Sequence, residues 1–166
     1  MKENSSIKEK ALHPEQVLKK KGAGEAAATV KEECGEGLDE RICMALRAAS
    51  DKKGIELMVL DLRAIASFTD YFLIASGTNV RQVQAIADEI VEQLKKHGTR
   101  AARVEGYNTA EWVLVDYGDF VVHVFEDKAR KFYDLERLWR DATRVALPPE
   151  LTGGDGGDQG SLRKES

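Results

Sequence analysis

Residues 68–98 read FTDYFLIASGTNVRQVQAIADEIVEQLKKHG, and within them the apolar pattern changes from that of a strand to that of a helix. The β-rich run ends at Ser76, and Asn79 follows with Gln82 three residues later, as in a helix capping box. Apolar residues then recur at helical spacing as far as Leu94. The stretch therefore predicts a strand that leads directly into a helix, as in α/β layer structures.

Two more elements are expected before this stretch. Residues 38–53 carry apolar side chains at helical spacing, with acidic residues at the N-terminal end and a stop at Gly54. Residues 55–62, IELMVLDL, form another β-rich run. The short connection from this run to residues 68–76 favours two adjacent, antiparallel strands.

Three strands and a helix are expected after residue 98. A short strand covers residues 101–105, and residues 111–127, EWVLVDYGDFVVHVFED, form a hairpin around the tight turn DYGD. The last helix begins near Glu126 or Asp127 and ends before Pro148. Its buried side is expected to consist of Phe132, Leu135, Leu138, Trp139, Ala142 and Val145.

These elements predict one α/β (α+β layered) domain over residues 38–147, with a mixed sheet of about five strands and flanking helices. Residues 1–37 contain no aromatic side chain and no sustained apolar stripe, so we expect a disordered N-terminal extension. Residues 148–166 contain five glycines and are expected to form a flexible tail.

The composition argues against several classes of protein. The net charge is −4, and residues 38–147 hold sixteen basic and eighteen acidic side chains, so direct binding of nucleic acid is disfavoured. No apolar run approaches the roughly 20 residues that span a membrane, and the N-terminus has no apolar signal region, so the expected location is cytoplasmic. Cys34 and Cys43 match no disulfide framework or metal spacing and are expected to be free thiols.

Catalytic interpretations of the polar residues are weaker than structural ones. Asp116 and Asp119 flank a turn whose Asp-X-Gly-Asp pattern is what such a turn requires, and no Asp-X-Asp pair is present for a two-metal site. His123 is better explained as a buried or interfacial imidazole than as a general base. Gly77 and Thr78 lack the glycine pattern of a nucleotide-binding loop. We therefore predict no catalytic residue, metal or cofactor.

Aromatic side chains are the remaining candidates for recognition. Trp112 opens a strand and Tyr107 precedes it in a loop, and the sequence favours neither the core nor an interface for these two. For Phe132 and Trp139, on the apolar stripe of the last helix, we predict core packing.

Three segments together resemble a known family. They are DYFLIASGTNVRQVQAIAD (70–88), EGYNTAEWVLVDYGDFVVHVF (105–125) and RKFYDLERLWRDA (130–142). In this order they are similar to the ribosomal silencing factors, known as RsfS or Iojap, and the resemblance spans residues 38–145. It implies a fold like that of nucleotidyltransferases without their catalytic carboxylates, and a protein that is not an enzyme.

The resemblance also implies a translational repressor that acts when nutrients are scarce. Such a protein binds the large ribosomal subunit through ribosomal protein uL-fourteen and sterically blocks joining of the small subunit. Family members often form homodimers. A mildly acidic domain suits a basic ribosomal protein as its partner. The alternative is a metal-dependent nucleotide-binding or nucleotidyltransferase-like enzyme that uses Gly77, Thr78, Asp116 and Asp119.

The family motifs also suggest residues for the partner interface. In this expectation Trp112 is the anchor, Asp116 and Asp119 face basic side chains, and Arg130 and Tyr133 form the rim or a dimer contact. Glu105 and Tyr107 lie beside them. All candidates for partner binding are Glu105, Tyr107, Trp112, Asp116, Asp119, Arg130 and Tyr133.

Overall fold

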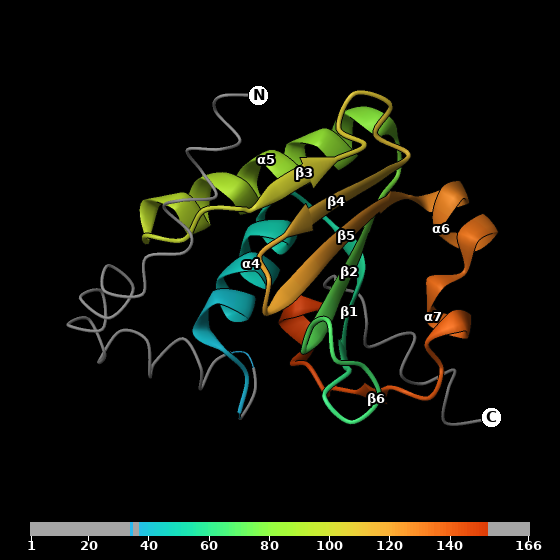
Figure 1. Ribbon diagram of the computed structural model, residues 1–166. Helices are drawn as coiled ribbons and strands as arrows, with labels where there is room; N and C mark the ends of the chain where they lie inside the picture. Colours follow the sequence, from blue (N-terminus) through green and yellow to red (C-terminus); the bar gives the residue numbers. More distant parts are fainter. Residues whose placement is uncertain (1–33, 35–36, 153–166) are drawn as a thin grey trace.

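A computed structural model describes residue 34 and residues 37–152, which form a six-stranded sheet with helices on both faces (Figure 1). The strand order is β3-β4-β5-β2-β1-β6. The elements are α4 (Glu40–Asp51), β1 (Ile55–Asp61), β2 (Tyr71–Gly77), α5 (Val80–Lys96), β3 (Arg103–Glu105), β4 (Trp112–Asp116), β5 (Phe120–Glu126), α6 (Asp127–Tyr133), α7 (Leu135–Leu138), β6 (Thr143–Arg144) and the 3-10 helix η2 (Pro149–Leu151).

The sheet is mixed because two antiparallel hairpins meet through a parallel pair. Strands β1 and β2 form the first hairpin and β4 and β5 the second. Strands β2 and β5 lie side by side in parallel, with Tyr71 opposite Phe120 and Gly77 opposite Glu126. Helix α5 lies in the connection between the two hairpins, and the Asn79 side chain caps its N-terminus by accepting from the Gln82 N–H. The predicted strand-to-helix transition is confirmed.

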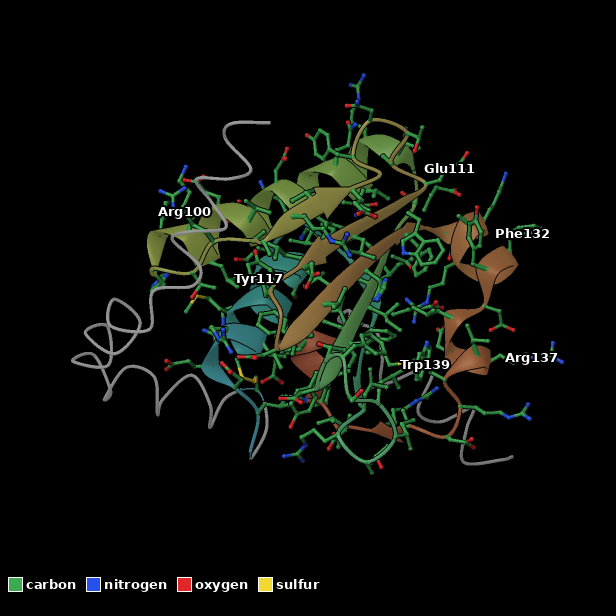
Figure 2. All side chains as sticks on the ribbon, in the orientation of Figure 1. Arg100, Glu111, Tyr117, Phe132, Arg137 and Trp139 are labelled. Carbon is green, nitrogen blue, oxygen red and sulfur yellow. A yellow bond between two sulfur atoms is a disulfide. The ribbon has the colours of Figure 1, made fainter. Side chains whose placement is uncertain are left out.

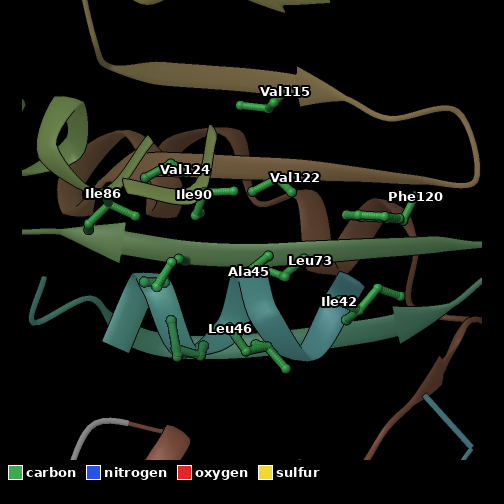
Figure 3. Packing of buried hydrophobic residues seen from close by; sticks show 14 of the residues in the cluster. Ile42, Ala45, Leu46, Leu73, Ile86, Ile90, Val115, Phe120, Val122 and Val124 are labelled. Carbon is green, nitrogen blue, oxygen red and sulfur yellow. The ribbon is translucent and has the colours of Figure 1, made fainter. Parts of the chain in front are cut away.

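Helices α4 and α5 cover one face of the sheet and enclose the larger core. Alternate residues of the strands, such as Leu73, Val122 and Val124, point toward these helices. Ile42 and Leu46 of α4 and further residues of α5 pack against them, as the close view shows (Figure 3). This face is therefore closed by the amphipathic sides of two helices.

The opposite face carries a smaller apolar cluster, and α6 and α7 lie on that side (Figure 1). Phe72, Ile74 and Phe125 are buried there, and the partly buried Trp112 and Trp139 pack against them. Short helices cover this face less completely than α4 and α5 cover the other. No helix in residues 37–152 has the length and apolar character needed to cross a bilayer.

The prediction of one continuous last helix is wrong. Asp134 adopts a left-handed conformation with φ of 51°, which ends α6 and separates it from α7. As a result Phe132 is 80% exposed and Leu138 is 75% exposed, so the core packing expected for Phe132 is also wrong. Trp139 does pack inward, edge-to-face against Phe72 with ring centroids 5.5 Å apart. The chain then adds β6, an edge strand that the sequence did not predict.

Both ends of the expected domain are extended by the structure. Cys34 and Cys43 form a disulfide with Cα atoms 5.6 Å apart, so the prediction of two free thiols is wrong. Cys34 is fully buried in the same core as the inner side of α4, and Gly37, just before this helix, has a φ of 85°. Leu151, expected in the C-terminal tail, is 93% buried on the same side. The expected disorder elsewhere in both tails lies outside the described residues.

Candidate functional site

The predicted site residues divide between the two ends of the β4–β5 hairpin. Trp112 begins β4 and pairs with Phe125, whereas Asp116 ends it and pairs with Val121. At about 3.3 Å per strand residue, these ends are roughly 13 Å apart. We call the Trp112 end the open end and the Asp116–Phe120 end the turn. The predicted residues therefore do not form one compact site.

At the turn, Asp116 has a structural role. Its Oδ1 atom accepts a hydrogen bond of 2.8 Å from the Gly118 N–H, and Gly118 has a φ of 88°. The other carboxylate oxygen lies 3.4 Å from Nε of Arg103 on the neighbouring strand. These contacts confirm the interpretation of DYGD as a turn sequence.

Asp119 is also bound within the chain. Its carboxylate accepts from Nη2 of Arg41 at 2.9 Å, and Arg41 donates from the same atom to Asp39 at 2.7 Å. Burial lowers the pKa of Arg41, but the hydrogen bonds to the two carboxylates outweigh this and hold the pKa above its usual value. The Arg41 guanidinium also lies over the Phe120 ring. Arg41 therefore balances the negative charge of the turn.

At the open end, Trp112 is held in a fixed orientation. Its indole Nε1 donates a hydrogen bond of 3.0 Å to Nδ1 of His123. The indole ring also contacts Phe125 and Tyr133, with centroid distances of 4.9 Å and 4.8 Å. Because its one polar atom points inward, the indole presents an apolar surface to the outside. Side chains of both hairpin strands and of α6 therefore meet here.

His123 supports this arrangement as a neutral imidazole. It is 3% exposed, and burial lowers its pKa to about 3. Since Nδ1 accepts from Trp112, the ring proton resides on Nε2, which has no hydrogen-bond partner among the described residues. Phe72 packs edge-to-face on the ring at 4.4 Å. The structure thus agrees with a buried imidazole bonded to a neighbour.

A pocket of about 360 Å³ lies at the open end, beside the indole of Trp112. The loop after β3 forms one wall of the pocket. At Gly106 this loop lies so close to β4 that a Cβ atom would collide with the Trp112 carbonyl, so only glycine allows the loop to pack here. The lining residues are Glu105, Gly106, Thr109, Glu111, Trp112, Leu114 and Tyr133. The pocket therefore combines aromatic rings with two carboxylates.

The carboxylates of this pocket differ in their pairing. Glu105 forms an ion pair of 3.0 Å with Arg103, in which both side chains are more than half exposed. Glu111 is exposed (Figure 2). Its side chain forms no hydrogen bond or ion pair within the described part of the chain. Glu111 directly precedes Trp112 in the sequence, but it was not among the residues predicted for the interface.

Two other predicted residues face elsewhere. The Tyr107 hydroxyl donates to Asp88 at 3.0 Å, and Gln84 donates to the Tyr107 carbonyl, so this loop is tied to α5. Arg130 is 4% exposed and donates to Ser76 and to the Glu56 carbonyl. Because Arg130 is buried, the rim or dimer contact expected for it is not supported.

The buried Arg130 also joins α6 to α7. Its guanidinium pairs with Glu136 at 2.8 Å across the left-handed residue Asp134. Asp134 and Glu136 form an Asp-X-Glu pair, but they lie at a helix junction and not on a strand. They therefore do not resemble the strand carboxylates of a two-metal site.

The residues of the enzymatic alternative do not come together. Gly77 ends the central strand β2, at the end of the sheet opposite the turn, and the length of the strand places it about 20 Å from Asp119. The Thr78 N–H and hydroxyl both donate to Gln82, as expected for helix capping. Among residues 34 and 37–152, no three His, Cys, Asp or Glu side chains are grouped to hold a metal ion.

The chain is similar to proteins named for an action on the ribosome. The family described as "Ribosomal silencing factor during starvation" matches residues 36–164. The ribosomal silencing factor RsfS of Bacillus subtilis is 46% identical over 104 residues, which are 63% of this chain and 88% of that protein. The mouse protein named mitochondrial assembly of ribosomal large subunit protein 1 is 32% identical over 87 residues, 51% of this chain and 38% of that protein.

The fold has a counterpart among solved structures. The crystal structure of protein CV0518 from Chromobacterium violaceum matches with a TM-score of 0.60 and 36% sequence identity. The match covers 65% of this chain and 89% of that one. The mixed sheet with flanking helices is therefore an arrangement already seen by crystallography.

Proposed function

The chain belongs to the family of ribosomal silencing factors, and from this we propose that it represses translation by binding the large ribosomal subunit. The proposed contact is ribosomal protein uL-fourteen, and the bound domain sterically prevents the small subunit from joining. We further propose that this occurs under nutrient limitation, in keeping with the family description. The proposed location is the cytoplasm. No chemical step by this chain is required.

The observation that carries the proposed docking is the open end of the hairpin. Trp112 is partly buried, is held by His123 and lies beside Glu105 and Glu111 in a pocket. A fixed aromatic ring with acidic neighbours suits a basic protein surface, because aromatic side chains anchor interfaces and complementary charge steers association. The carboxylates at the same place repel the phosphates of ribosomal RNA.

The remaining interface residues are assigned by their geometry. We propose Trp112, Glu105 and Tyr133 as direct contacts, and we add Glu111. Asp116, Asp119 and Tyr107 have partners within the chain, so we propose that they shape the hairpin and its loops. Self-association into a homodimer is also expected, and exposed Phe132 and Leu138 offer apolar area for such a contact.

Sedimentation with isolated ribosomal subunits tests the proposal. The full chain is mixed with large or small subunits, and the complementary subunits are then added. We expect co-migration with the large subunit and a loss of assembled ribosomes. Trp112→Ala, checked for folding by circular dichroism, is expected to bind weakly and to permit assembly.

Two outcomes would contradict the proposal. Folded wild-type protein that binds neither subunit would exclude the docking function. Binding that leaves subunit joining intact would exclude the steric block while retaining the docking. Metal-dependent nucleotide binding that is lost in Asp116→Asn or Asp119→Asn would instead favour the enzymatic alternative.

A further inference from the structure

The pocket at the open end has the size and lining of a side-chain receptor. Its volume of about 360 Å³ is near the lower limit for ligand pockets, which favours one side chain over a nucleotide. Trp112, Leu114 and Tyr133 provide apolar surface, and Glu105 and Glu111 provide negative charge. We propose that this pocket receives one arginine side chain from the basic docking partner, an inference that rests on the function proposed above.

The aromatic surface of the pocket is prepared in advance. The hydrogen bond to His123 and the contacts with Phe125 and Tyr133 hold the indole of Trp112 in one orientation. Little rotamer entropy is therefore lost when a ligand packs against this ring. The electron-rich face of tryptophan is also the strongest of the aromatic surfaces for attracting a cation.

The charge of the pocket selects a cation. Glu111 has no ion pair within the described residues, and the pair between Glu105 and Arg103 is exposed. Exposed pairs contribute little, so Glu105 can exchange Arg103 for an incoming cation at small cost. In contrast, both carboxylates would repel a phosphate or an acidic peptide.

The combination of ring and carboxylates suits arginine better than lysine. A guanidinium is planar and weakly hydrated, so it stacks on an aromatic face while its N–H groups donate in the plane to carboxylates. A lysine ammonium is compact and strongly hydrated, and it cannot form both contacts in this way. The partner is therefore expected to present an arginine at the centre of its contact surface.

Matched charge variants test this assignment in the full chain. Glu111→Gln removes one negative charge at the pocket, and Glu92→Gln removes one from an exposed site on α5. We expect Glu111→Gln to weaken the affinity for isolated large subunits about tenfold and Glu92→Gln to change it less than twofold. If the two variants weaken binding equally while wild-type protein binds, the pocket assignment is wrong and the docking function stands.

A second measurement does not depend on the ribosome. Nα-acetyl-arginine amide is titrated into the full chain while the indole N–H resonance of Trp112 is followed by NMR, and the neutral citrulline analogue serves as control. We expect a saturable shift with the arginine compound alone, reduced in Glu111→Gln. Equal shifts with both compounds would overturn the selectivity for guanidinium. A selective shift without binding to large subunits would retain the pocket and overturn the docking function.

Discussion

The two ends of the β4–β5 hairpin carry similar acidic residues but use them differently. At the turn, Asp116 and Asp119 are bound by Arg103 and Arg41 and by the turn backbone. At the open end, Glu111 has no such partner in the described part of the chain and lies beside a fixed indole ring. The proposed docking therefore distinguishes acidic residues by their pairing: Asp116 and Asp119 have partners within the fold, whereas Glu111 is available to a partner.

The largest effect is expected inside the protein, at Arg130, the buried arginine that joins α6 to α7. Arg130→Ala removes a buried partner from Glu136 and two donated hydrogen bonds, so the free energy of unfolding should fall by about 3 kcal/mol in urea titrations. Exposed Arg137 on α7 provides the control, because Arg137→Ala should cost less than about 0.5 kcal/mol. A stable Arg130→Ala protein with weakened binding would show instead that Arg130 is a direct contact.

Truncation of the anchor is expected to have the next largest effect, on binding. Trp112→Ala should weaken the affinity for large subunits by about 2 kcal/mol or more, roughly thirtyfold, because buried aromatic anchors dominate interfaces. Fluorescence or filter-binding titrations with folded protein measure this loss. An unchanged affinity would remove the open end from the interface.

The buried imidazole makes the stability depend on pH. The pKa of His123 is about 3 in the folded protein and about 6.5 in the unfolded chain, so the unfolded state binds more protons between these values. The folded state is fully stable with respect to this group above pH 6.5, where the imidazole is neutral in both states. Its free energy of unfolding falls as the pH drops from 6.5 toward 3, because the unfolded chain takes up a proton that the buried imidazole does not. We expect a loss of roughly 2 kcal/mol between pH 7 and pH 5. Urea titrations at both pH values should show a smaller difference in His123→Gln.

The smallest effect is expected at the turn. Asp119→Asn removes one exposed ion pair with Arg41, so the free energy of unfolding should change by less than about 1 kcal/mol. Its affinity for large subunits should remain within a factor of two of wild type, measured in parallel with Glu111→Gln. A tenfold loss of affinity in Asp119→Asn would show that the turn also contacts the partner, and would contradict a purely structural role for Asp119.

The regular elements were predictable because their patterns are local. The helices α4 and α5 follow from apolar spacing and capping residues, and the two hairpins follow from β-rich runs around short connections. The parallel contact between β2 and β5 was not specified by the sequence, since it depends on how two separate hairpins dock. The family resemblance, now supported by the comparisons, is what joined the local predictions into one functional hypothesis.

Where the sequence misled, the cause was tertiary structure. Asp134 is an ordinary residue in a helical pattern, and only the structure shows its left-handed conformation and the consequent exposure of Phe132. A cation such as Arg130 is expected at the surface, and its burial depends on Glu136 and on distant backbone. Cys34 and Cys43 have a spacing that matches no known framework, so their pairing emerged only from the path of the chain.

The central parallel pair of strands has a consequence for the kinetics of folding. Tyr71 and Phe120 are partners across this pair although 49 positions separate them, since 120 − 71 = 49. Each hairpin closes a short loop, whereas docking β5 against β2 requires closure of a much longer one, which is entropically costly and slow. The β2–β5 contact is thus expected to be the late step of folding. Mutations along it should slow refolding less than they accelerate unfolding.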